Sequence, residues 1–259
     1  MLNRCNNFFL ILLFVGINFP GTIFAENKCL QLFPEYLKTA ILDLKTSNQT
    51  FVSKDRKAQL DAVAKSAQIS YELLSHLDVG ELVETVFKHA NSDLKNKIKT
   101  SVTAVDHIGY IVPGRIDNQD LISSIKKNTS FGLQRSFPST IVAKELATIL
   151  KLNQPVPTEI FIFKSGNKSL EIFKPILDSD AAAKIIQRGI GTHIALLIQS
   201  KAELLAVMHD LLSQGYAMPD FMNNQAMENP KQNSLTAYFD LQFQGQSLRI
   251  EFIAMEPVL

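Results

Sequence analysis

The sequence predicts an α+β protein in which a helical region precedes two βαβββ modules that form one open, cup-shaped sheet. Apolar residues recur at helical spacing up to about position 101 and at strand spacing after it. The order strand, helix, strands then occurs twice, as a repeat of structure rather than of close sequence. The predicted division is a signal peptide at 1–25, a helical region at 26–101 and paired modules at 102–259, with module limits of 102–178 and 190–257.

The N-terminus has the three parts of a secretory signal peptide. Arg4 precedes the apolar stretch 8–15, and Pro20, Gly21 and Ala25 follow it. We expect cleavage after Ala25 and export to the periplasm or the medium. The alternative is an uncleaved membrane anchor, but glycine and proline interrupt an apolar stretch that is at the short limit for a span. We therefore expect no stable membrane span after the signal is removed.

The bulk composition excludes some classes of partner. The chain has 259 residues with 26 basic and 25 acidic side chains, so a net charge of +1 gives no electrostatic case for nucleic acid. Cys5 would leave with the signal, and Cys29 then has no partner within the chain. We expect no internal disulfide, so stability must come from the core.

The helical region is predicted from three apolar stripes. The spacing of Phe33, Leu37, Ile41 and Leu44 predicts one helix face, and Ser53 is a candidate cap for a second helix. The second stripe is Leu60, Val63, Ala67, Tyr71 and Leu74, and the third is Leu82, Val86, Ala90 and Leu94. A helical bundle or cover for the next domain is the simpler interpretation, and a partner-binding helix is the alternative.

The first module begins where β-rich sequence replaces the helical pattern. Its predicted elements are a strand at 105–112, a helix capped by Asp117, a weaker strand at 130–137, a helix at 140–152, and strands at 159–163 and 169–173. Ile108 and Tyr110 are expected to face the covering helices as packing residues.

The second module repeats this order after a predicted linking helix at 181–188. A strand is expected at 192–199, and Ser200 with Glu203 forms a capping box for a helix that Gly215 stops. A loop rich in Met, Asn and Pro is expected to run to about Asn233, followed by strands at 235–243 and 247–252. Two such modules side by side bury each other's open edges and share one cup.

The repeat places polar residues at equivalent positions. His107 and His193 lie on the first strand of each half, and Glu171 and Glu251 follow them by 64 and 58 positions on the last strand. A carboxylate among Leu, Ile and Phe in mid-strand is costly to bury alone. Two imidazoles and two carboxylates are a suitable ligand set for a divalent cation, which would neutralise that charge.

These features resemble the vicinal oxygen chelate superfamily, which includes glyoxalase I, methylmalonyl-CoA epimerase and extradiol dioxygenases. The segments VDHIGY at 105–110, LEIFKP at 170–175 and GIGTHIAL at 189–196 look like module starts and ends of that family. The resemblance covers about 103–257 and not the helical region. The helix predicted at 140–152 departs from the family pattern, which leaves the pocket shape and the substrate open.

The resemblance implies a metal that holds adjacent oxygens of a substrate and stabilises an enediolate or a bound oxygen species. His107, His193 and Glu251 are the implied ligands. Glu171 would be a fourth ligand or a general base, and without it the other three resemble the facial triad of an iron(II) dioxygenase. The metal is left open among Fe, Mn, Zn, Ni and Co, with Mn or Zn favoured outside the cytoplasm.

The function expected from this resemblance is that of an exported metal-dependent isomerase, lyase or dioxygenase acting on a small oxygenated substrate. Arg135 and Arg249 are candidates for holding an anionic group of the substrate, although Arg249 could equally pair with Glu251. The alternative is a non-catalytic module that binds a small ligand in the same cup without a metal. Whether the chain forms a homodimer stays open.

Overall fold

The computed structural model describes residues 23–53, 55–177, 181, 185, 192–218, 220–225, 232–243 and 246–257. Most of the predicted signal peptide therefore lies outside the described residues, and export stays a prediction. The same holds for the linking helix expected at 181–188, of which only two positions are described.

The N-terminal region is helical and packs on the sheet. It consists of α2 (Ile23–Gln49), the short 3-10 helix η1 (Thr50–Val52), α3 (Arg56–His76), α4 (Val79–Val86) and α5 (Ser92–Ser101). Leu37, Ile41 and Leu44 are buried, as their spacing predicts, in one core that also contains Ile108 and Tyr110 of the sheet. Among the described residues, no helix is both long enough and apolar enough to cross a membrane.

Two details of this region differ from the prediction. The side chain that caps α3 is that of Asp55 rather than Ser53, and it accepts a hydrogen bond from the Lys57 amide. The third stripe belongs to two helices instead of one, because the chain turns after Val86 and Asn91 caps a new helix. Asp55 and Asn91 both have short polar side chains, which accept hydrogen bonds from the first free amides of a helix.

One eight-stranded sheet joins the two modules, in the order β2-β3-β4-β1-β5-β8-β7-β6. In each module the first strand lies parallel to the last, and β1 and β5 pair antiparallel at the centre. This is the paired-module arrangement predicted from the sequence. The strands are β1 (Val102–Ile111), β2 (Gly132–Pro138), β3 (Thr158–Ser165), β4 (Lys168–Pro175), β5 (His193–Ile198), β6 (Asp220–Gln225), β7 (Gln232–Phe243) and β8 (Gln246–Pro257).

The second module is more regular than predicted. The segment expected as a loop contains β6, which pairs antiparallel with β7 at the edge of the sheet. Its sequence, DFMNNQ, includes two asparagines, a residue type that is depleted in strands, so propensity alone gave no signal. The second module is therefore a complete βαβββ unit, like the first.

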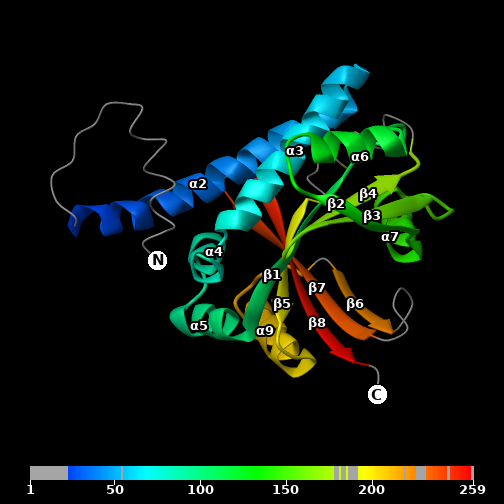
Figure 1. Ribbon diagram of the computed structural model, residues 1–259. Coiled ribbons are helices and arrows are strands. Elements are labelled where there is room, and N and C mark those ends of the chain that lie inside the picture. The colour runs from blue at the N-terminus through cyan, green and yellow to red at the C-terminus, as the bar shows by residue number, and fades with distance from the viewer. Residues whose placement is uncertain are drawn as a thin grey trace.

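The two faces of the sheet have different environments. Helices α3 and α6 (Asn118–Lys127) pack on one face, and α9 (Lys201–Ser213) packs on the same side of the second module. Helix α7 (Thr140–Leu150), which joins β2 to β3, lies apart from these helices beside the other face (Figure 1). The face away from α3 and α6, called the site face below, carries the candidate ligands.

Candidate metal centre

The four predicted ligands lie on the four central strands of the sheet. Glu171 on β4 and His193 on β5 both pair with Gly109 of β1, and His107 of β1 and Glu251 of β8 both pair with Ala195 of β5. Cross-strand partners point to the same face of a sheet, and so do residues two positions apart on one strand. The register therefore brings all four side chains to one place on the site face.

The side-chain atoms meet there. The Nε2 atom of His107 lies 3.0 Å from the Nε2 atom of His193, 2.9 Å from Glu171 Oε2 and 3.5 Å from Glu251 Oε2. His193 Nε2 is 3.0 Å from the same oxygen of Glu251. The ligand atoms of His107, Glu171 and His193 all lie within 4.8 Å of one another, and Glu251 touches both imidazoles.

The separations around the two imidazole nitrogens fit a single cation. Atoms that bind one divalent metal at 2.0–2.2 Å lie about 3.0 to 3.5 Å from one another in tetrahedral or octahedral geometry. Two nitrogens and two carboxylate oxygens also form a ligand set that Zn, Mn and Fe accept. The site is buried, since His107, His193 and Glu251 are 6%, 4% and 6% exposed.

Gly109 makes this convergence possible. A Cβ atom added at Gly109 would lie 2.5 Å from His193 Nε2, which is inside the contact distance of the two atoms. A glycine beside a candidate ligand could leave room for an ion. At Gly109 the space is instead filled by the ring of His193 itself, which lies against the bare backbone of β1.

Asp106 orients the first histidine, a role that the sequence reasoning missed. Its Oδ2 atom lies 2.8 Å from His107 Nδ1 and accepts a hydrogen bond from it, which leaves Nε2 facing the cluster. Regular strand alternation would send Asp106 to the opposite face. The register with β5 shifts between Val105 and His107, and this bulge lets two successive side chains meet.

The charges in the cluster favour protonated imidazole when no metal is bound. Burial by itself lowers the pKa of His107. The charge of Glu171 and hydrogen bonds to Asp106, Glu171 and Glu251 outweigh burial and raise it well above its usual value. Burial would raise the pKa of Glu251, but bonds from both imidazoles lower it well below its usual range. A cation must therefore compete with protons for the site.

Tyr238 is a second residue that the sequence reasoning missed. It lies on β7 opposite Glu251, forms a hydrogen bond with that carboxylate, and packs edge-on to His193 at 6.5 Å between ring centroids. Burial and the carboxylates Glu251, Glu145 and Glu171 raise the pKa of its phenol well above the usual value. A neutral phenol thus remains as a hydrogen-bond donor to Glu251.

The two predicted substrate-binding arginines have different surroundings. Arg249 is held by Asp240, with Nε 2.9 Å from Oδ1, and by Glu145 of α7, with Nη1 3.3 Å from Oε1. These two carboxylates, and not Glu251, are its ion-pair partners. Arg135 is exposed on β2, with its guanidinium 4.9 Å from the centroid of the Phe137 ring.

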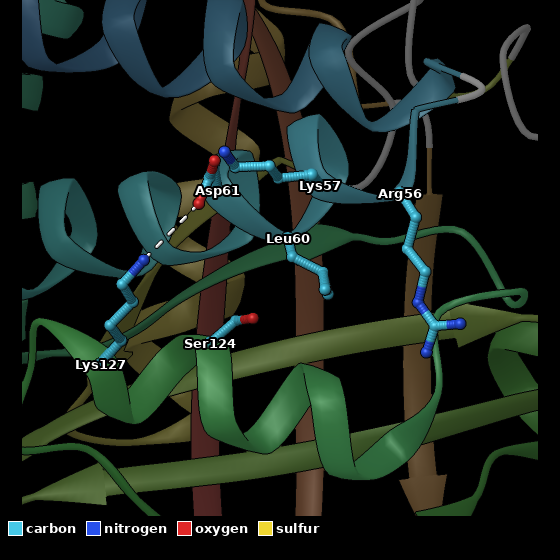
Figure 2. A pocket seen from close by; sticks show the side chains of 6 residues that line it. All are labelled: Arg56, Lys57, Leu60, Asp61, Ser124 and Lys127. Carbon is cyan, nitrogen blue, oxygen red and sulfur yellow. Dashed lines mark ion pairs between the residues drawn. The ribbon is translucent and has the colours of Figure 1, made fainter.

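A separate pocket of about 480 Å³ lies on the opposite, helix-covered side of the sheet (Figure 2). Helices α3 and α6 line it with Leu60, Ser124 and four charged side chains, namely Arg56, Lys57, Asp61 and Lys127. Arg56 is paired with Asp120, and Lys127 lies 3.6 Å from Asp61. It contains no group of metal ligands, so the histidine cluster is the stronger candidate site.

Comparisons with known proteins place the chain beside three solved structures of low sequence identity. Neither a protein-family model nor a curated protein sequence matches the chain. A hypothetical protein from Bacillus halodurans C-125 is 17% identical, with coverage of 60% of this chain and 96% of its own and a TM-score of 0.41. Methylmalonyl-CoA epimerase from Mycobacterium tuberculosis is 16% identical, with coverage of 59% and 88% and a TM-score of 0.39.

A mutant of 4-hydroxymandelate synthase from Streptomyces coelicolor is 9% identical, with a TM-score of 0.41. The alignment covers 60% of this chain and 49% of the synthase, so this chain spans about half of that protein's length. The fold assignment therefore depends on this chain's own strand order and register, and the site assignment on its own geometry.

Proposed function

We propose that the protein is an exported metal-dependent enzyme that acts as an isomerase or lyase on a small molecule with adjacent oxygens. The observation that carries the proposal is a cluster built from both modules, in which ligand atoms of His107, Glu171 and His193 lie within 4.8 Å of one another and Glu251 adjoins the two imidazoles. Because Glu171 lies within the cluster, 2.9 Å from His107, the four-ligand form is favoured over a facial triad. That form supports isomerase or lyase chemistry rather than oxygen chemistry.

In this proposal, some side chains of the cluster hold a cation and one of them accepts a proton from the substrate. The two histidines and Glu251 are the most buried of the four, with Asp106 orienting His107 and Tyr238 holding Glu251. A divalent cation held here supplies charge that polarises a substrate oxygen and acidifies the neighbouring C–H group. Glu171 has a more exposed side chain, at 17%, so it is the ligand that can leave the cation when substrate binds and then accept the proton from that carbon.

Metal content is the first test of this proposal. Purified protein reloaded with Mn, Co or Zn should bind about one equivalent, because three ligand atoms already lie within 4.8 Å of one another and Glu251 adjoins both imidazoles. His107→Ala should reduce this to about a tenth or less, because it removes the atom at the centre of the cluster. His209→Ala is the matched control, since that histidine is exposed on α9. Equal metal content in the wild-type protein and the His107→Ala variant would contradict the proposal.

Proton transfer is the second test. In D2O, the metal-loaded protein should exchange the C–H proton of some members of a panel of α-hydroxyketones, measured by NMR. Glu171→Gln should abolish the exchange and retain metal, while Glu159→Gln, on the opposite face of neighbouring β3, should change neither. Exchange that is independent of Glu171 would contradict its role as the base. Stoichiometric metal without exchange of any compound would assign the site to ligand binding.

A further inference from the structure

We propose that the wing of the sheet formed by β2 and β3 binds an anionic group of the substrate through Arg135 and Lys164. The substrate would then carry a negative charge about 10 Å from the oxygens held at the metal centre, because β2 and β4 are two strand spacings apart. This inference rests on the proposed function and specifies the class of substrate.

The register places both cations on the site face. Arg135 pairs with Ile162 of β3, which pairs with Glu171 of β4. Lys164 lies two positions beyond Ile162 and pairs with Ser169, which in turn pairs with His107. Since paired residues share a face, the two cations lie diagonally across neighbouring strands, on the same surface as the metal ligands.

The exposure of the side chains along β3 indicates the side from which a substrate reaches the metal centre. Along β3 it increases from buried Ile160, through half-buried Ile162, to exposed Lys164. Glu171, the ligand on the side of this wing, is also the ligand with the most exposed side chain. A substrate that reaches the metal centre from this side crosses Ile162 and lies beside Arg135 and Lys164.

Charge distinguishes these cations from Arg249. Arg249 already faces the two carboxylates of Asp240 and Glu145, so another anion there would meet net negative charge. Within the described part of the chain, neither Arg135 nor Lys164 forms an ion pair. A divalent cation balances the charges of Glu171 and Glu251 at the centre, whereas the wing keeps a net positive charge that attracts an anion at a distance from the metal.

A chelating probe with a charged tail tests this arrangement. Suberic acid monohydroxamate has two adjacent oxygens at one end and a carboxylate at the other, and its methyl ester lacks the charge. Metal-loaded protein should bind the acid about tenfold more tightly than the ester, as measured by calorimetry, because two exposed cations contact one carboxylate. Succinic acid monohydroxamate, whose carboxylate cannot reach the wing, should show no such preference over its ester.

Substitutions locate the effect. Arg135→Gln and Lys164→Gln should each reduce the preference for the suberic acid about threefold, and together they should abolish it. Lys168→Gln is the matched control, because Lys168 lies on the same hairpin but contacts Tyr71 on the opposite face. The metal content and the affinity for the ester should stay unchanged in all four variants.

The outcomes separate this inference from the proposed function. Equal affinities for acid and ester, or a preference that survives the double substitution, would overturn the inference while the metal centre stands. Failure of the loaded protein to bind either hydroxamate would also overturn it, because the wing would then give no access to the metal. Absence of bound metal would overturn both proposals.

Discussion

At the scale of single residues, the candidate centre depends on side chains that bind no metal. Gly109 leaves the space for the ring of His193, Asp106 fixes the orientation of His107, and Tyr238 holds Glu251. The four candidate ligands could be identified from the sequence because each has an equivalent in the other half. Asp106 could not, because its role depends on a bulge that regular strand alternation does not predict.

Gly109→Ala should disrupt the centre without removing a ligand. The new methyl group would overlap the His193 ring, so we expect the ring to move and metal affinity to fall about tenfold or more. Isothermal titration with Zn or Mn measures this change. Gly132→Ala is the control, because its added Cβ would lie 4.0 Å from the nearest atom. Equal affinities for the two variants would show that Gly109 does not position His193.

Metal affinity should rise with pH. The pKa of His107 is raised, so its proton is present below that value and must leave when a cation binds. For one displaced proton, affinity should increase about tenfold per pH unit up to the raised pKa. Asp106→Asn removes one cause of the shift, so its affinity should level off at a lower pH. An affinity in calorimetry that is independent of pH between about 6 and 8 would contradict this account.

At the scale of elements, the helical region is hydrogen-bonded to Thr192, the residue directly before the strand that carries His193. Asn48 of α2 donates to Thr192 Oγ1 at 3.0 Å and accepts from Ser66 of α3 at 3.0 Å, and all three residues are buried. Apolar spacing predicted both helices, but in α3 only Val63 and Ala67 of the predicted stripe are buried and its other three residues are half-buried. It could not predict their docking, because a polar contact between residues 144 positions apart leaves no local pattern.

Asn48→Leu should therefore destabilise the whole chain. It leaves two buried hydroxyls without their amide partner, and we expect the free energy of unfolding in urea to fall by about 2 to 4 kcal/mol. Gln49→Leu, at the exposed next position, should change it by about 0.5 kcal/mol or less. If both variants unfolded at the same urea concentration, the helical region would contribute little through this bond.

At the scale of the whole molecule, one sheet and one core join the helical region and the two βαβββ modules. The core runs from α2 through β1 and β4 to β5 and β8, so the helical region covers the paired modules. The two halves meet at the β1–β5 pair, where each contributes one histidine and one glutamate. The repeat predicted this symmetry. The strand propensity of its residues did not predict β6, because its strand conformation comes from pairing with β7.

The central claim is that both halves hold one divalent cation between them. An anomalous difference map from crystals of the Zn- or Co-loaded protein tests it most directly. We predict one strong peak within about 2.0 to 2.2 Å of His107 Nε2, His193 Nε2 and one oxygen each of Glu171 and Glu251. A map with no peak between the two histidines, or with its main peak elsewhere on the chain, would contradict the account.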